Sequence, residues 1–205
     1  IRIGHPVYPE QYRALDVKLN VKAALFRKHV YKLGKNKRLL GFDPDVEAIA
    51  HPESKILLKQ EIREATQKLG VTADGKHILL FRYQSQSVIL REVGRLRELS
   101  FRAVKEGSGK RRDIDQYDYD YDHILLWDDH DWEIVGAYRM RQTKDVRPES
   151  LYTHTLFEYN EAFLPYLQQG LELGRSFVQP RYWGMRSLDY LWYGIGAYLK
   201  AHPDI

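Results

Sequence analysis

The sequence predicts an α/β domain in which a mixed sheet is flanked by helices. From His77 onward, segments with strand-like and helix-like patterns follow one another in the order β-α-β-β-β-α-β-α. The composition, 43% hydrophobic and 29% charged residues, is typical of a globular protein and not of a disordered chain. The length of 205 residues suits one domain of ordinary size, or one domain with a fragment of another.

The first third of the chain is predicted to be separate from the main domain. Ile1–Pro6 has the pattern of a strand end, and Glu10–Leu33 carries apolar residues at helical spacing. A second helix is predicted over Pro52–Leu69. We therefore expect three parts, which are a remnant of another domain, a linker with a helix, and the main domain: residues 1–45, 46–76 and 77–205.

Local patterns predict each element of the main domain. HILLFR at His77–Arg82 is an apolar run of strand length, and Ser87–Val104 has helical periodicity. Two strands, His123–Trp127 and Trp132–Met140, flank a DDHD connection that is typical of a hairpin. The remaining expected elements are a strand or extended segment, a short helix, a strand and an aromatic-rich helix: Leu151–Phe157, Asn160–Gln169, Glu172–Val178 and Gly184–Ala201.

Composition and charge exclude some classes of protein and leave others open. Cysteine is absent, which excludes disulfides and thiolate zinc sites. No apolar run approaches the roughly 18 residues of a transmembrane helix. The basic excess of the chain is concentrated in its first third, in Arg27, Lys28, Lys32, Lys35, Lys37 and Arg38. Such a basic patch attracts anionic lipid, nucleic acid or an acidic protein, or it is only a solvated helix face.

The most informative segment combines a strand, a turn and a helix start. LELGRSFV at Leu171–Val178 leads directly into QPRYWGMRS at Gln179–Ser187. Free backbone N–H groups in such a turn and at the start of a helix bind phosphate groups, because both present partial positive charge. The turn is therefore a candidate site for a phosphate-bearing cofactor arm, and the alternative is an ordinary Pro/Gly helix entry.

Four motifs follow one another along the main domain: Arg97 and Phe101 in LRELSFRAV, Asp113–Asp118, Arg139 at the end of a hairpin strand, and Glu172–Arg175. In this order they resemble the GCN5-related N-acyltransferase (GNAT) superfamily. GKRRDIDQYD, WEIVGAYR and LELGRSFV are most similar to its ornithine-lipid N-acyltransferase branch, often labelled hemolysin-like, which is related to the acyl-homoserine-lactone synthases.

The resemblance has consequences for the extent of the domain. It covers about residues 77–205 and implies a GNAT-like sheet flanked by helices. Since a complete family domain continues with further strands, the resemblance also implies truncation at the C-terminus. Residues 1–33 more weakly resemble the tail of a glycerolipid O-acyltransferase domain, which some bacterial lipid synthases join to the N-acyltransferase domain.

Glu172 is the candidate catalytic base. N-acylation needs an uncharged amine, so a carboxylate must accept the ammonium proton. The resemblance places the matching glutamate of the family in the acyl-transfer cleft, and it groups Arg175 of the same ELGR motif with Glu172 as a catalytic candidate. The alternative is a simple pair between Glu172 and Arg175, but a spacing of three in a strand predicts that they lie on opposite faces.

An ion network is expected beside the cleft. By resemblance, Asp115 and Asp118 pair with Arg97 and Arg139 around the site, with Phe101 on the same helix as Arg97. Asp113, Asp115 and Asp118 could instead bind a cationic amino acid or form a solvated acidic loop. Tyr117, Tyr119 and Tyr121 alternate with aspartates in this segment, which argues against a fully solvated loop. We expect no metal, because one flexible segment rarely supplies a full ligand set.

The turn at Arg181–Arg186 is the expected site of the donor phosphate. It is similar to the superfamily's pyrophosphate loop, and Arg181, Gly184 and Arg186 are its candidate phosphate-binding residues. Arg186 stands where a small residue is usual. A single phosphate, as on the phosphopantetheine arm of acyl carrier protein, tolerates this bulk and charge better than the pyrophosphate of coenzyme A.

Taken with the resemblance, these residues predict an N-acyltransferase. It would move a 3-hydroxylated fatty acyl group from acyl carrier protein to the amine of an amino acid such as ornithine, with no tightly bound cofactor. The expected location is cytoplasmic, peripheral at the inner face of an anionic membrane, without nucleic acid as a partner. The alternatives are an acyl-homoserine-lactone synthase, which would need S-adenosylmethionine, and a non-catalytic module that binds membrane or carrier protein.

Overall fold

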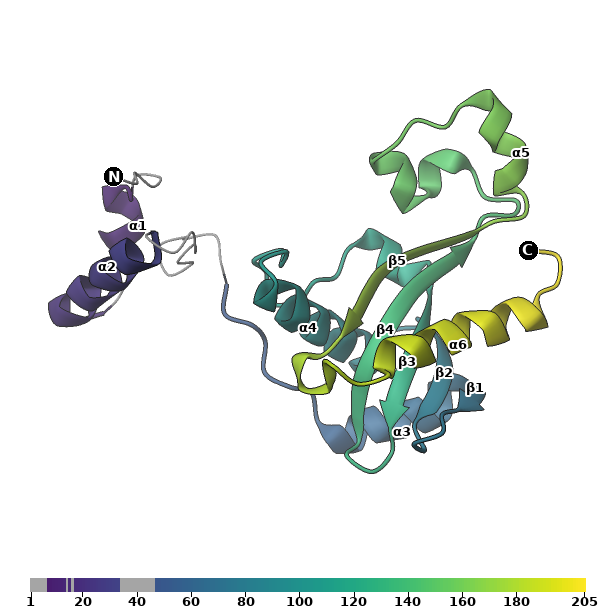
Figure 1. Ribbon diagram of the computed structural model, residues 1–205, viewed down its shortest axis with the longest axis horizontal. Coiled ribbons are helices and arrows are strands. Elements are labelled where there is room, and N and C mark those ends of the chain that lie inside the picture. Colours follow the sequence, from purple (N-terminus) through teal and green to yellow (C-terminus); the bar gives the residue numbers. More distant parts are fainter. Residues whose placement is uncertain (1–6, 14, 16, 34–46) are drawn as a thin grey trace. The chain divides into compact units, whose positions relative to one another are not determined.

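The chain divides into two compact units, Ile1–Ala48 and Ile49–Ile205, shown in Figure 1. The computed structural model describes residues 7–13, 15, 17–33 and 47–205. In the first unit, the sequence predicts one helix over Glu10–Leu33. The structure instead has two helices, α1 (Pro9–Arg13) and α2 (Leu19–Leu33).

Helix α2 leaves basic and apolar side chains exposed. Arg27 and Lys28 are exposed, and so are the apolar side chains of Leu19 and Val30. An aromatic contact, with ring centroids 5.5 Å apart, joins Phe26 of α2 to Tyr12 of α1. Other predictions for the N-terminal region fall outside the described residues: the strand end at Ile1–Pro6 and the basic residues Lys35, Lys37 and Arg38.

The second unit contains a five-stranded sheet in which the strands follow chain order. Every neighbouring pair is antiparallel, whereas the sequence predicts a mixed sheet. Residues 83–121, which include helix α4 (Val88–Ala103), connect β2 to β3, and the first residue of β3, Asp122, pairs with the last residue of β2, Arg82. The strands are β1 (Thr66–Val71), β2 (His77–Arg82), β3 (Asp122–Asp128), β4 (Glu133–Gln142) and β5 (Leu171–Val178).

The segment expected to be a linker is part of this unit. Helix α3 (Lys55–Ala65) ends earlier than the predicted helix over Pro52–Leu69, and the chain turns directly into β1. Strand β1 pairs with β2 along its length, so pairing with a neighbouring strand overrides the local helical pattern. The main domain therefore begins near Ile49 and not at His77.

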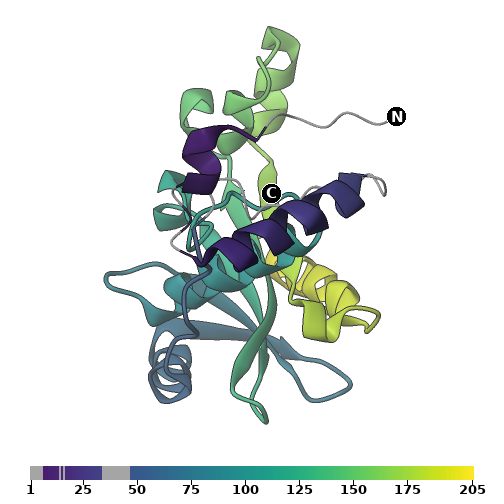
Figure 2. The same cartoon turned by 90° about the vertical axis from the view of Figure 1, so that its left-hand side faces the viewer.

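Helices cover both faces of the sheet, which confirms the predicted α/β class (Figure 2). Helix α4 (Val88–Ala103) and α3 pack on one face with a core around Leu79, Leu125 and Trp127. Helix α6 (Ser187–Ala201) packs on the other face around Ile78 and Ile124. The Ser87 hydroxyl accepts a hydrogen bond from the Leu90 N–H (2.9 Å), which fixes the start of α4.

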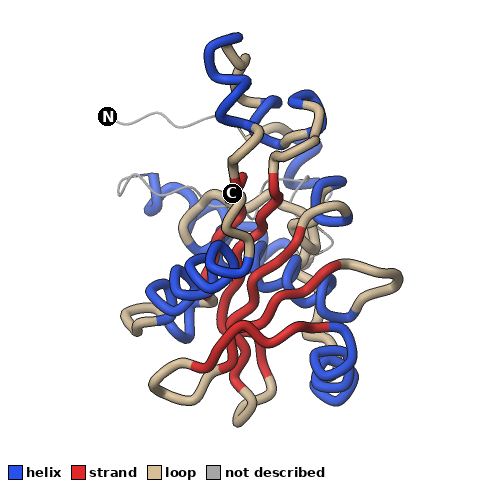
Figure 3. Tube along the Cα trace, turned by 90° about the vertical axis from the view of Figure 1, so that its right-hand side faces the viewer, coloured by secondary structure: helices blue, strands red, loops and turns tan. Residues whose placement is uncertain are grey.

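Residues 143–170, the β4–β5 segment, project beyond the ends of the two strands that they join (Figures 1 and 3). The predicted strand at Leu151–Phe157 is wrong, because this stretch contains a 3-10 helix at Tyr152–Thr155. The predicted short helix is present as a 3-10 turn at Glu161–Phe163 followed by α5 (Leu164–Leu167). Since the segment leaves the sheet, its apolar residues pack on one another and on the start of β5.

Strand β5 contains a bulge at Arg175. Between the pairs Ala137–Phe177 and Arg139–Gly174, β4 has one residue and β5 has two. Arg175 has a φ of +50°, in the left-handed region. A bulge of this kind changes the direction of the strand's side chains and is common beside functional sites.

No helix within the described ranges is long and apolar enough to cross a bilayer.

Candidate active site

Glu172 lies near the start of β5 and is held by two hydrogen bonds. The residue as a whole is only 9% exposed. Oε1 accepts a bond from the backbone N–H of Thr153 (2.6 Å), and Oε2 accepts a short bond from the phenol of Tyr121. The Tyr121 oxygen in turn accepts the N–H of Tyr152 (2.9 Å). The carboxylate that the sequence singled out is thus fixed in orientation by two other segments of the chain, one around Tyr121 and the other at residues 152–153.

Burial raises the pKa of the Tyr121 phenol far above its ordinary value, and the hydrogen bond to Glu172 adds to this shift. The phenol therefore stays protonated at any ordinary pH. It acts as a permanent donor to the carboxylate.

An apolar pocket of about 540 Å³ opens beside Glu172. It lies between the β4–β5 segment and the first residues of β5. Its volume is in the range of small-molecule sites, and its lining is mainly aromatic and aliphatic with few polar groups. The lining residues are Thr143, Leu151, Thr153, Phe157, Tyr159, Phe163, Tyr166, Leu167, Gly170, Leu171, Glu172 and Leu173.

The expected ion network is present and buried. Arg97 donates to both carboxylate oxygens of Asp118 at 2.9 and 3.1 Å, and both side chains are inaccessible to solvent. Arg139 contacts Asp115 at 2.5 Å and Asp118 at 3.3 Å. Burial opposes ionisation of Asp118, but Arg97 and Arg139 outweigh it and hold the pKa of this carboxyl below its ordinary value.

Arg175 belongs to the same network, contrary to the expectation from simple strand alternation. It reaches Asp115 at 3.3 Å and Asp113 at 3.5 Å. The bulge turns its side chain toward residues 113–121, the acidic loop that also supplies Tyr121 to Glu172. Glu172 and Arg175 therefore point to the same side of β5 without pairing with each other. Burial raises the pKa of Asp113, although Arg97 and Arg175 oppose this shift.

Aromatic rings complete the surroundings of the network. The guanidinium of Arg139 lies 5.1 to 5.7 Å from the ring centroids of Tyr117, Tyr121 and Tyr152. These cation–π contacts compensate for the buried nitrogens of Arg139 that lack a hydrogen-bond partner. Phe101 is not part of the network, because it packs against the apolar core beside α4.

The predicted phosphate turn separates its three candidate residues. Arg181 is engaged by Asp131 and by Glu133 (2.7 Å) of the β3–β4 hairpin, so its charge is already compensated. Gly184 has a φ of +80°, which glycine adopts without strain. Arg186 is exposed, and its contacts are with neighbours on α6: Asp189 at 3.5 Å, the hydroxyl of Tyr193 at 3.3 Å and the ring of Tyr190. No side chain caps the start of α6, so its N–H groups remain available.

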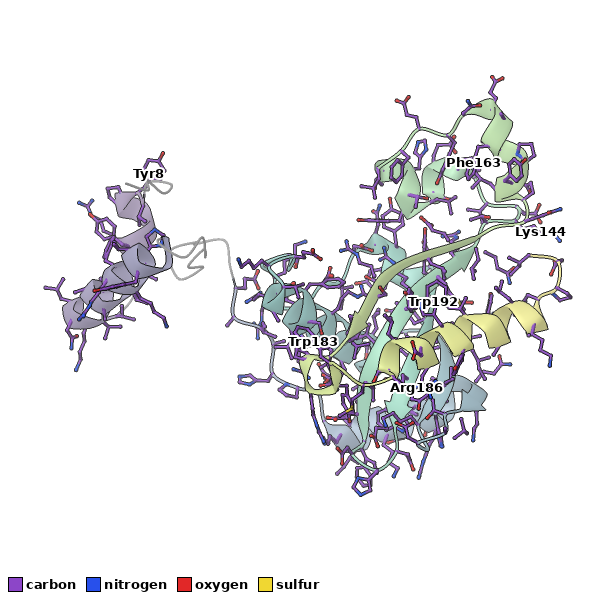
Figure 4. All side chains as sticks on the ribbon, viewed as in Figure 1. Tyr8, Lys144, Phe163, Trp183, Arg186 and Trp192 are labelled. Carbon is purple, nitrogen blue, oxygen red and sulfur yellow. The ribbon has the colours of Figure 1, made fainter. Side chains whose placement is uncertain are left out.

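The two ends of β5 carry different features. Figure 4 labels Arg186 at the turn before α6 and Phe163 in the β4–β5 segment, with β5 running between them. The turn offers exposed positive charge, while the opposite end offers the apolar pocket and Glu172. A long, partly polar molecule that follows β5 would therefore meet phosphate-type contacts at one end and apolar contacts at the other.

Several residues of this site do not follow from the sequence motifs. Tyr121 stands out in the sequence because tyrosine and aspartate alternate in YDYDYD, but this local pattern does not reveal that its phenol bonds Glu172. Thr153 and the aromatic lining come from a stretch without a motif. Among the described residues, no group of three metal-ligating side chains converges.

Comparison with known proteins identifies the domain. The model of the acetyltransferase (GNAT) domain family matches residues 96–193, which include the second half of α4, the acidic loop, Glu172 and the turn. Residues 96–193 form a GNAT domain. Five antiparallel strands flanked by helices are consistent with the GNAT fold.

Relatives of the chain that carries this GNAT domain include N-acyltransferases of two amino acids. It is 36% identical over 176 residues to a glycine N(alpha)-acyltransferase of Bacteroides thetaiotaomicron, a match that covers 78% of this chain and 52% of the relative. It is 32% identical over 161 residues to an L-ornithine N(alpha)-acyltransferase of Brucella abortus, which covers 68% and 56%. The chain thus spans about half the length of these relatives. No solved structure matches it significantly.

Proposed function

We propose that this GNAT domain transfers a fatty acyl group from a phosphopantetheine thioester to the α-amine of an amino acid. The observation that carries the proposal is the position of Glu172, a fixed and nearly buried carboxylate in the wall of an apolar pocket. The names of the relatives support an α-amine as acceptor, with glycine and ornithine as the first candidates.

Glu172 accepts the proton that the substrate ammonium must lose. The neutral amine then attacks the thioester carbonyl, so a C–N bond forms and the carbonyl oxygen becomes an oxyanion. When the oxyanion collapses, the C–S bond breaks, and the thiolate leaves with the second proton of the nitrogen. The products are an amide and a free thiol. N–H groups on the unpaired edge of β5 are suitable donors to the oxyanion, since β5 is the last strand of the described sheet.

The donor arm is proposed to follow β5. Its phosphate would meet Arg186 and the uncapped start of α6, and its amides would pair with the free edge of the strand. From Val178 to Glu172 the strand spans about 20 Å, at roughly 3.3 Å per residue. An extended phosphopantetheine arm covers such a length, which places the thioester beside Glu172.

The fatty chain of the donor is proposed to occupy the apolar pocket beyond Glu172. Aromatic residues such as Phe157 and Phe163 would bury its methylene groups. We infer acyl carrier protein as the donor because Arg186 suits one phosphate, and because an acidic partner is attracted to exposed basic residues such as Arg27 and Lys28 of α2. An amphiphilic product and a basic surface further suggest a reaction at the cytoplasmic face of an anionic membrane.

The proposal is tested by identifying products. The full chain is incubated with 3-hydroxyacyl carrier protein and isotopically labelled glycine, ornithine or S-adenosylmethionine, and with matched acyl-coenzyme A as the second donor. We expect an N-acyl amino acid, detected by mass spectrometry, together with one equivalent of free thiol. A lactone formed from S-adenosylmethionine would support the homoserine-lactone alternative. Carrier-protein binding without any turnover would indicate a non-catalytic module.

A further inference from the structure

Arg141 and Glu172 are opposite each other on neighbouring strands. They are register partners in the β4–β5 pair, so their Cα atoms are about 5 Å apart and their side chains leave the sheet on the same face. Oppositely charged side chains in such positions usually pair. Here they do not, because Oε1 and Oε2 of Glu172 are bonded to Thr153 and Tyr121.

Arg141 differs from the other arginines of this face. Arg139 and Arg175 are held by carboxylates of the acidic loop. Within the part of the chain that the structure describes, Arg141 has no carboxylate partner, and its recorded contact is with the ring of Tyr121, at 5.3 Å from the centroid. Its guanidinium is therefore not engaged in an ion pair with a carboxylate of the described residues.

Arg141 also lines a polar cavity of about 250 Å³. The ring of Tyr121 links this cavity to the catalytic carboxylate, because its hydroxyl bonds Glu172 while the guanidinium of Arg141 lies at its ring. A guanidinium without an ion pair and an oriented carboxylate are thus separated by a single aromatic side chain. Of the two carboxylates that line the cavity, that of Asp122 is paired with Arg82 at 3.1 Å. The other residues that line the cavity are Arg82, Asp120, Asp122, Gln142 and Tyr198.

We infer that Arg141 binds the α-carboxylate of the acceptor amino acid while Glu172 receives its α-ammonium group. The ligand class is an α-amino acid zwitterion, and the inference rests on the proposed function. A guanidinium forms two parallel hydrogen bonds with a carboxylate, which fixes orientation as well as position. Arg141 would thereby aim the amine at the thioester and reject amines that lack an adjacent carboxylate.

The test compares glycine with glycinamide, which keeps the amine and lacks the negative charge. In the full chain, we expect kcat/KM for glycine to exceed that for glycinamide by at least tenfold, since a charge-assisted hydrogen bond is lost with the amide. Arg141→Gln should raise KM for glycine about 10- to 100-fold, leave KM for the acyl donor unchanged and abolish the discrimination. Arg141→Lys should restore part of it, because charge returns without the bidentate geometry.

Arg147→Gln is the matched control, because it removes the same charge from an exposed arginine of the β4–β5 segment. We expect it to behave as wild type. Binding of labelled glycine is measured separately by NMR titration, so that the result does not depend on turnover. Weakened glycine binding in Arg141→Gln supports the inference even if no amine is acylated, an outcome that would refute only the proposed function. Unchanged binding and discrimination in a folded Arg141→Gln variant would overturn the inference.

Discussion

The phenol of Tyr121 donates a hydrogen bond to Oε2 of Glu172, across a separation of 51 residues in the chain. Tyr121 comes from the acidic loop and Glu172 from β5, so the contact exists only because the sheet brings the two segments together. The same phenol accepts the N–H of Tyr152. Through one side chain, the acidic loop of the ion network, the β4–β5 segment and the carboxylate of Glu172 are joined.

Glu172→Gln is expected to abolish most acyl transfer without unfolding the chain. The amide keeps an oxygen for the N–H of Thr153 but cannot accept the ammonium proton. We expect kcat to fall about 10²- to 10⁴-fold, the usual contribution of a general base. Single-turnover rates and the melting temperature are measured together. Turnover near wild type would remove Glu172 from the role of base.

Asp118→Asn is expected to destabilise the fold strongly. Removing the carboxylate leaves the guanidinium of Arg97, which is fully buried, without its charge partner. A broken buried pair of this kind costs about 3–5 kcal/mol of unfolding free energy. The control is Asp204→Asn, whose partner Lys144 is exposed, and we expect it to leave urea denaturation unchanged. Equal effects of both variants would contradict a buried network.

His123 is expected to make stability depend on pH. Its complete burial on β3, helped by the positive charge of Arg97, lowers the pKa of the imidazole to about 4. Between pH 6.5 and 4 the unfolded chain therefore binds a proton that the folded chain does not, so stability falls as the pH falls. A lowering of about 2.5 pKa units corresponds to about 3 kcal/mol.

The His123 contribution is isolated by comparison with His123→Gln. Glutamine keeps an N–H that can donate to the carbonyl of Asp118, as the ring nitrogen Nε2 does at 3.1 Å. Denaturant unfolding is followed from pH 7 to pH 4.5 in both proteins. The variant should lack most of the decline in this window, and an equally steep decline in the variant would rule out His123 as its cause.

Phe157→Ala is expected to change the preference for acyl chain length. Phe157 lines the apolar pocket, while the adjacent Leu156 is similarly exposed and does not line it. We expect kcat/KM for long-chain donors to fall about tenfold and that for short-chain donors to stay constant, because each buried methylene contributes about 0.8 kcal/mol. Leu156→Ala is the control. A uniform loss for all chain lengths would place the fatty chain elsewhere.

Arg186→Ala is expected to weaken use of the donor. Since Arg186 is exposed, its contact with a phosphate is modest, and we expect KM for acyl carrier protein to rise about fivefold. The effect should shrink at high salt, because the Debye length falls from about 10 Å at 0.1 M to about 3 Å at 1 M. Transfer from acyl carrier protein and from acyl-coenzyme A is measured at both salt concentrations. Salt-independent, equal use of both donors would favour coenzyme A.

The sequence by itself determined the elements whose signals are local. Strand β2 matches the predicted His77–Arg82, and α4 lies within the predicted Ser87–Val104, because apolar periodicity and a serine cap act within one element. The motifs also singled out Glu172 and the partners of the ion network, Arg97, Asp118 and Arg139. These motifs consist of residue types in a fixed order along the chain, and a resemblance to a family is recognised from that information alone.

Only the tertiary structure decided how these residues meet. Strand β1 exists because β2 offers it a hydrogen-bonding edge, which overrides the helical pattern of residues 66–69. The bulge turns Arg175 toward the acidic loop, although alternation along an ideal strand predicts the opposite side. The apolar pocket depends on the β4–β5 segment, which has no motif. The placement of Arg141 beside Glu172 depends on the register of β4 and β5. Register and long-range packing are set by contacts between distant segments, and no local pattern encodes them.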